Sequence, residues 1–196
     1  MGSRAEILAK IKANKPESLE LPNIDPLIFD EGLNLVEEFT KKVEVVGGNV
    51  REIKSNVDVI SHVKTFFPDS KVNFSTLEKT TDFNTLDLAS IKSPQDLEDL
   101  DVLILESDLA VAENGAVWVA DSQLPFRVLP FITKHLVLVV SKKHIVPYMH
   151  QAYQKLNNAP TDFGVFISGP SKTADIEQSL VIGAHGALSL TVFLKS

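Results

Sequence analysis

The patterns of a strand, a turn and a helix follow one another in Ile167-Ser-Gly-Pro-Ser-Lys-Thr-Ala-Asp-Ile-Glu177. The apolar run at residues 163–167 predicts a buried strand, and the small polar residues 168–173 predict a turn. Residues 174–182 predict a helix, because apolar side chains recur at helical spacing and acidic ones lie in the first turn. A strand that passes through a short turn into a helix is typical of α/β proteins.

The same turn is a candidate anion site. Backbone N–H groups stay free at a helix N-terminus and favour a negative charge there. Lys172 lies at the positive end of the predicted helix dipole, where a cation does not stabilise the helix, so it is a candidate ligand contact. Ser171 or Thr173 can cap the helix. A solvated lysine in an ordinary capped turn is the other interpretation, and the spacing alone leaves both open.

Two separated motifs carry a family resemblance. The first is the run 168–177 together with Val181-Ile-Gly-Ala-His-Gly186, and the second is Ser107-Asp-Leu-Ala-Val-Ala-Glu-Asn-Gly-Ala-Val117. In this order they resemble the signatures of the LUD domain, the LutC/YkgG family of bacterial lactate-utilisation proteins. The family continues its His-Gly motif with a proline and a basic residue, where this chain has Ala187 and Leu188. This departure bears on any role of that basic residue and leaves the fold unaffected.

The resemblance implies a set of site residues. Glu113 and His185 become the catalytic candidates, with His185 as a proton donor or ligand contact. Glu113 would be the nucleophile or base if the chain is a stand-alone enzyme of the fold group. The ligand-binding or anion-binding candidates are Gly115, Ser168, Gly169, Ser171, Lys172, Thr173 and Asp175. Without the resemblance, Glu113 is the shoulder of a hairpin and His185 belongs to a turn that ends a helix, and these interpretations stay open. We expect one shared pocket, because strands 163–167 and 102–105 both end at a motif and ligands bind outside the carboxyl ends of strands.

Apolar strands alternate with amphipathic helices along the chain, which predicts an α/β fold with a largely parallel sheet. Asn114-Gly115 between two apolar runs predicts a β-hairpin inserted at residues 109–120. The resemblance implies the same class, a three-layer fold of the NagB/RpiA/CoA-transferase-like type. We expect strands at 50–53, 71–74, 101–106, 109–112, 116–120, 135–140, 163–167 and 190–194. We expect helices at 3–13, 30–43, 57–67, 94–97, 147–157 and 174–182, and a short helix or turn at 125–132.

Residues 1–25 predict an N-terminal helical arm with a linker, and residues 26–196 predict the LUD (LutC-like) α/β domain. The arm helix carries one apolar stripe, Ile7, Leu8 and Ile11, and a helix this short is marginal unless it packs on something. The arm therefore packs either on its own domain or on a second subunit, which makes it a candidate contact of a homo-oligomer.

Composition excludes several classes of site. The net charge of −7 argues against nucleic acid as a partner, because no basic stripe is present to neutralise phosphates. The 196 residues include no cysteine, so this chain offers no thiolate nucleophile and no Cys-ligated zinc or iron–sulfur cluster. The five histidines lack metal-binding spacing. No apolar run approaches the roughly 20 residues of a membrane span, and the N-terminus lacks a signal-peptide pattern, so we expect a cytoplasmic protein.

Two functions are compatible with these features. The resemblance implies a component of a three-protein, iron–sulfur-dependent system that oxidises L-lactate to pyruvate. The clusters would belong to partner subunits, and this chain, without a cofactor of its own, would be an accessory or small-carboxylate-binding subunit. The alternative is a stand-alone enzyme of the CoA-transferase and sugar-phosphate isomerase fold group, acting on an anionic small molecule.

Overall fold

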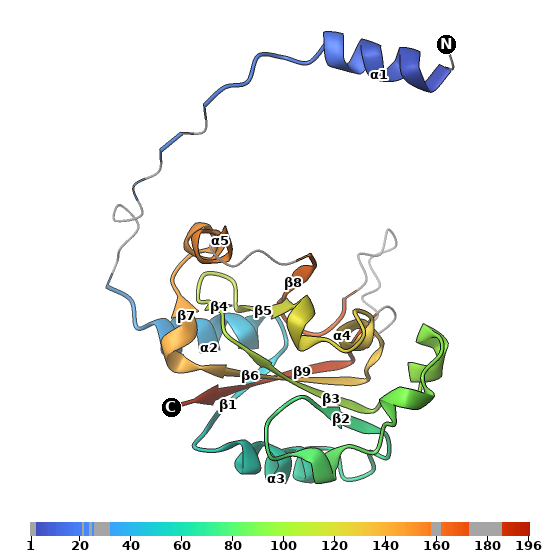
Figure 1. Cartoon of the computed structure of the whole chain (residues 1–196). Coiled ribbons are helices and arrows are strands. Elements are labelled where there is room, and N and C mark those ends of the chain that lie inside the picture. Colours follow the sequence, from blue (N-terminus) through green and yellow to red (C-terminus); the bar gives the residue numbers. More distant parts are fainter. Residues whose placement is uncertain (1–2, 21, 24, 26–31, 158–161, 173–185) are drawn as a thin grey trace. The chain divides into compact units, whose positions relative to one another are not determined.

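The computed structural model describes residues 3–20, 22–23, 25, 32–157, 162–172 and 186–196 (Figure 1). The chain divides into two compact units, Met1–Glu31 and Gly32–Ser196. The first unit contains helix α1, Ser3–Ala13, which has no buried side chain. The second unit contains two sheets and the remaining helices.

The larger sheet has five strands, all parallel, in the order β1-β9-β6-β3-β2. Its strands are β1 Asn49–Ile53, β2 Asn73–Ser75, β3 Val102–Ser107, β6 His135–Ser141 and β9 Ser189–Lys195. The apolar centres of β3, β6 and β9 are buried, as strands covered on both faces require. The predicted parallel α/β sheet is confirmed.

The smaller sheet has four strands in the order β7-β4-β5-β8. They are β4 Ala110–Val111, β5 Ala116–Ala120, β7 Ile145–Val146 and β8 Gly164–Ile167. Strands β4 and β5 form the predicted hairpin, in which Gly115 takes the positive φ of 67° that such a turn needs. Strand β8 pairs antiparallel with β5 and is only half-buried. The strand predicted at 163–167 is confirmed, but the prediction that it is buried and ends at the same edge as 102–105 is wrong, because it lies half-buried in the smaller sheet.

Five α-helices and five 3₁₀ turns are found in the described ranges. The helices are α1, α2 Leu35–Val45, α3 Asn56–Phe66, α4 Leu129–Ile132 and α5 Met149–Asn157. The 3₁₀ turns are Thr81–Phe83, Leu88–Ser90, Pro94–Leu97, Asp121–Gln123 and Lys142–His144. Helix α2 begins later than the predicted residue 30, because the Asn34 side chain accepts hydrogen bonds from the Val36 and Glu37 amides and caps it there. The predicted helix 174–182 lies outside the described residues.

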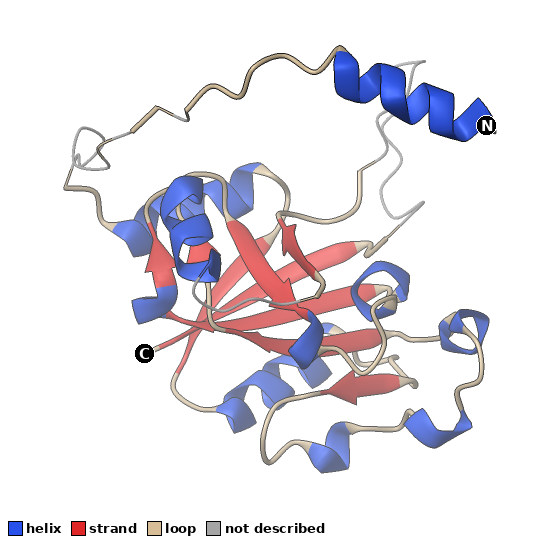
Figure 2. Cartoon of the chain, turned by 45° about the horizontal axis from the view of Figure 1, so that its top comes forward, coloured by secondary structure: helices blue, strands red, loops and turns tan. Residues whose placement is uncertain are grey.

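The two faces of the larger sheet are covered differently. Side chains alternate along β3, so Val102 and Ile104 face α3, whereas Leu103 and Leu105 face α2 and the smaller sheet. Figure 2 shows α3 on one side of the larger sheet and the smaller sheet with α2 on the other. These are the three layers expected from the resemblance.

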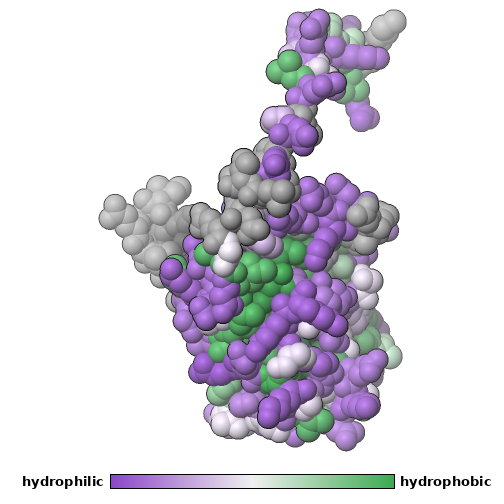
Figure 3. Space-filling view, turned by 90° about the vertical axis from the view of Figure 1, so that its left-hand side faces the viewer, coloured by the Kyte–Doolittle hydropathy of each residue, from purple (hydrophilic) through white to green (hydrophobic). Residues whose placement is uncertain are grey.

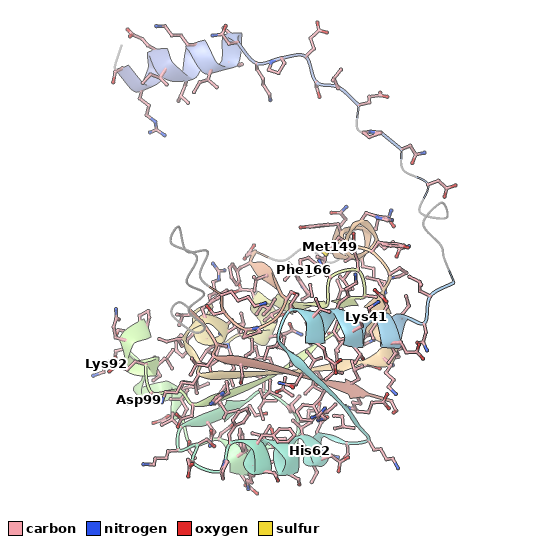
Figure 4. The ribbon with its side chains drawn as sticks, turned by 180° about the vertical axis from the view of Figure 1, so that it is seen from behind. Lys41, His62, Lys92, Asp99, Met149 and Phe166 are labelled. Atoms are coloured by element: carbon pink, nitrogen blue, oxygen red, sulfur yellow. The ribbon has the colours of Figure 1, made fainter. Side chains whose placement is uncertain are left out.

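Helix α5 covers the outer side of the smaller sheet. Met149 of α5 and Phe166 of β8 pack against the buried apolar cluster that includes Leu109, Val111 and Ala152. In Figure 4 these two labelled side chains lie across the larger sheet from His62 of α3. Within the described ranges, no helix has both the length and the apolar character needed to cross a bilayer.

Asp101 links neighbouring segments at the amino edge of the larger sheet through hydrogen bonds. One carboxylate oxygen accepts hydrogen bonds from the Lys71 amide (2.8 Å) and the Val72 amide (3.0 Å). The other accepts one from the Lys134 ammonium (2.7 Å). Burial raises the pKa of the Asp101 carboxyl, but these hydrogen bonds outweigh burial and bring the pKa down from 3.8 to about 2.

Replacing Asp101 by alanine is expected to lower the free energy of unfolding by about 2 kcal/mol, because charged hydrogen bonds are lost and two amides lose their acceptor. Asp99→Ala removes an exposed carboxylate close by and serves as the control, with a change within about 0.5 kcal/mol. Urea denaturation of the three proteins makes the measurement. Equal losses in the two variants would contradict the role given to Asp101.

The contribution of the Asp101 carboxylate to the free energy of unfolding depends on pH. The folded-state pKa of Asp101 lies below the unfolded value, so the stabilisation is present above about 3.8 and is lost as the pH falls towards about 2. The difference in unfolding free energy between wild type and Asp101→Ala should therefore shrink between about pH 5 and about pH 2. A constant difference over this range would show that the ionised carboxylate is not what stabilises the edge.

Deleting residues 1–25 is expected to leave a domain that unfolds cooperatively, because none of the described residues of α1 is buried. Circular dichroism during thermal unfolding measures this. A deletion variant without a cooperative transition would show that the arm belongs to the core.

Candidate functional site

The turn after β8 lines a cavity of about 290 Å³. Its described lining consists of Pro130, Phe131, Leu136, Val165, Phe166, Ile167, Ser168, Gly169, Pro170, Ser171, Lys172, Gly186 and Ala187. Most of the wall is apolar, while Ser168, Ser171 and Lys172 supply hydroxyl groups and one ammonium group. Such a lining fits a small ligand with one apolar side and one anionic group.

Hydrogen bonds hold this turn from two directions. The Ser171 amide donates to the Ala187 carbonyl (2.8 Å), which ties the turn to the segment leading into β9. The Ser168 hydroxyl donates to the Asn114 carbonyl (2.7 Å) in the β4–β5 hairpin turn. The two sequence motifs therefore touch each other, although their strands do not end at one edge of one parallel sheet.

Two glycines let both turns approach helix α2 closely. A Cβ atom on Gly115 would lie 2.7 Å from the Val43 amide nitrogen, and one on Gly169 would lie 2.7 Å from the Val46 carbonyl oxygen. Both glycines also have positive φ values, 67° and 75°. The geometry explains these glycines by packing, whether or not a ligand binds beside them.

Glu113 lies at the hairpin but outside the described lining of the cavity. Its carboxylate accepts a hydrogen bond from the Met149 amide (2.9 Å) at the start of α5, where a negative charge is favoured. Its own amide donates to the Pro147 carbonyl (3.0 Å). Glu113 thus joins the hairpin to α5, and its catalytic role stays a prediction.

The structure brings four of the predicted ligand-binding residues together in one cavity, namely Ser168, Gly169, Ser171 and Lys172. Gly115 lies at the hairpin turn beside them. His185, Thr173 and Asp175 lie outside the described residues. No carboxylate or imidazole occurs among the described residues that line the cavity, so this part of the site can bind an anion but supplies no general base.

A second cavity lies at the carboxyl ends of β2 and β3, where the sequence analysis named no site residue. It has a volume of about 490 Å³ and is lined by Thr76, Glu106, Asp108, Ser122, Gln123, Leu124 and Pro125. The rule that ligands bind at the carboxyl ends of parallel strands would have found it. Among the described residues, no group of three His, Cys, Asp or Glu side chains is arranged to hold a metal ion.

Comparison with known proteins identifies the family. The sequence model of the LUD domain matches residues 36–194. This chain belongs to the LUD domain family. The match covers both sheets and every residue of the described cavity, so the resemblance stated from the two motifs is confirmed.

Curated relatives share the name lactate utilization protein C. The relative from Macrococcus caseolyticus (strain JCSC5402) is 31% identical over 165 residues, which cover 81% of this chain and 70% of the relative. The relative from Geobacillus sp. (strain WCH70) is 35% identical over 101 residues, covering 48% of this chain and 42% of the relative. The alignment with the Geobacillus protein thus leaves more than half of that protein unmatched.

A solved structure supports the fold. The crystal structure of a DUF162 family protein from Deinococcus radiodurans superposes with a TM-score of 0.62 over 83% of this chain and 96% of that chain. The sequence identity is 13%, so this similarity concerns the fold alone.

Replacing Gly115 by alanine is expected to lower the free energy of unfolding by more than about 2 kcal/mol, because the strain of a positive φ adds to a clash with backbone. Gly32→Ala is the matched control. Gly32 has a similar φ of 62°, but an added Cβ atom would have nothing within 4 Å. The free energy of unfolding of Gly32→Ala should therefore fall by about 1 kcal/mol or less. If urea denaturation gives the same decrease in unfolding free energy for Gly115→Ala and Gly32→Ala, the close packing of Gly115 on α2 does not contribute to stability.

Proposed function

We propose that this chain is a LutC-like component of a bacterial system that oxidises L-lactate to pyruvate, and that it binds a small carboxylate in the cavity beside Ser168 and Lys172. The observation that carries the proposal is the LUD match over residues 36–194. The relatives named lactate utilization protein C support the choice of substrate.

The cavity suits such a ligand. Lys172 can donate a charged hydrogen bond to a carboxylate, and Ser171 adds a hydroxyl donor, since the Ser168 hydroxyl already donates to the Asn114 carbonyl. The side chains of Phe131 and Leu136 give an apolar wall against which the methyl group of lactate can lie. A chain with a net charge of −7 repels anions overall, so a local cation is needed for an anion to bind.

The chemistry of oxidation belongs, in this proposal, to partner subunits that carry iron–sulfur clusters. The chain contains no cysteine and so has no thiolate with which to hold a cluster. Figure 3 shows an apolar area framed by hydrophilic side chains on one face of the larger unit, a surface of the kind that partners cover. This chain then acts as an accessory, carboxylate-binding subunit without a cofactor of its own.

Lys172→Ala is expected to weaken the binding of L-lactate or pyruvate by about 1.5–3 kcal/mol, because one charged hydrogen bond is lost, with little change in stability. Lys155→Ala removes an exposed cation from α5 and is the matched control. Calorimetric titration of the three proteins gives the affinities. Equal affinity of wild type and Lys172→Ala would remove the lysine from the site.

Purification of the tagged chain from its native host tests the assembly. We expect a protein that carries an iron–sulfur cluster to copurify, seen by its visible absorption and by mass spectrometry. Repeated recovery of the chain alone, together with turnover of acyl-CoA or sugar-phosphate compounds by the isolated chain, would replace this proposal by a stand-alone enzyme of the same fold group.

A further inference from the structure

The face of the larger sheet that carries α3 changes character along its length. Towards the carboxyl edge it is apolar, with Ile53, Val139 and Phe193 packed against α3. Towards the amino edge the same face carries polar side chains on three neighbouring strands, namely Asn49 and Arg51 of β1, His135 of β6, and Ser189 and Thr191 of β9. Helix α3 ends at Phe66, and this polar area begins beside its last residue.

Two adjoining cavities occupy this amino edge. The smaller, of about 210 Å³, is lined by Asn49, Arg51, Phe66, Phe67, Ser189 and Thr191. The larger, of about 410 Å³, is lined by Phe66, Phe67, Pro68, Asp69, Ser70, Asp101 and His135. Phe66 and Phe67 border both, and His135 Nδ1 lies 2.8 Å from the Ser189 Oγ atom of the other cavity. We call the two together the amino-edge pocket.

Aromatic rings form one wall of the amino-edge pocket. The Phe67 ring stacks on the His135 imidazole, with ring centroids 4.0 Å apart and an interplanar angle of 18°. The Phe66 ring stands edge-on to Phe67 and is 41% exposed. A large aromatic side chain at the mouth of a polar cavity offers a flat surface on which another ring can stack.

The charged side chains around the pocket determine which charged group a ligand can carry. Burial lowers the pKa of His135, which favours the uncharged imidazole. The Asp101 carboxylate is already held by Lys134 and two backbone amides. Arg51 donates from Nη1 to the Val50 carbonyl (3.0 Å), and no carboxylate partner is found for it in the described part of the chain. The smaller cavity therefore presents one cation with free donors.

We propose that the amino-edge pocket binds a planar aromatic carboxylate. The ring lies on Phe66, while Arg51 and the hydroxyl groups of Ser189 and Thr191 bind the carboxylate. A single guanidinium matches one carboxylate in a bidentate pair. Asp69 and Asp101 border the neighbouring cavity and disfavour a ligand with several negative charges, such as a polyphosphate.

This pocket is separate from the cavity beside Lys172. Leu136 lines the cavity beside Lys172, and its neighbour His135 lines the amino-edge pocket. Successive residues of a strand point to opposite faces, so the two sites lie on opposite faces of the larger sheet. The amino-edge pocket can thus be tested independently of the proposed lactate site.

Benzoate is the probe, and saturation-transfer NMR and calorimetry on the full chain are the measurements. We expect saturable binding of benzoate and weaker binding of cyclohexanecarboxylate, which has the same charge without the aromatic ring. Arg51→Gln should weaken benzoate binding at least about tenfold, and Phe66→Leu about fivefold. Each comparison is repeated in the Lys172→Ala background, which removes any benzoate bound beside Lys172.

Two variants serve as matched controls. Lys64→Gln removes an exposed cation from α3, and Tyr153→Leu removes an exposed aromatic ring from α5, and neither residue lines the pocket. Both should bind benzoate as wild type does. Failure of folded wild type to bind benzoate saturably, or equal binding by Arg51→Gln and wild type, would overturn the proposal.

Discussion

The close approach of two turns to the C-terminal end of α2 is the constraint on which the candidate site depends. Gly115 brings the β4–β5 hairpin against Val43, and Gly169 brings the turn after β8 against Val46. With both turns packed there, the Ser168 hydroxyl donates to the Asn114 carbonyl. The cavity beside Lys172 thus takes its shape from backbone packing on a helix that supplies none of its described lining.

Local patterns predicted most of the strands, because the buried runs of β3, β6 and β9 are continuous and apolar and the hairpin turn is Asn-Gly. The start of α2 was missed, since its cap, Asn34, is an ordinary polar residue whose role appears only when its side chain meets two amides. The sequence also did not predict that β8 belongs to the smaller sheet. An apolar run shows that a strand is buried or half-buried. Which strand pairs with it depends on contacts between residues distant in sequence.

The candidate site was predicted only in part, because contacts between residues distant in sequence leave no local pattern. The residues 168–172 are contiguous, so their meeting in one cavity follows from a single turn. Glu113 could be placed at the hairpin from its neighbours, but its contact with the Met149 amide depends on where α5 begins in space. The amino-edge pocket had no sequence signal at all, since its polar residues come singly from strands β1, β6 and β9 and gather only through register.

The position of β9 bears on how this chain is made. Strand β9 lies between β1 and β6, and it is the only neighbour of β1 in the larger sheet as described, with Asn49 paired to Thr191. During synthesis β1 therefore gains this neighbour only after residues 189–195 have left the ribosome. Such distant pairing slows folding and leaves an unpaired edge exposed in the meantime. A chain that ends before residue 189 lacks the strand that joins β1 to β6, so β1 has no neighbour in the larger sheet as described.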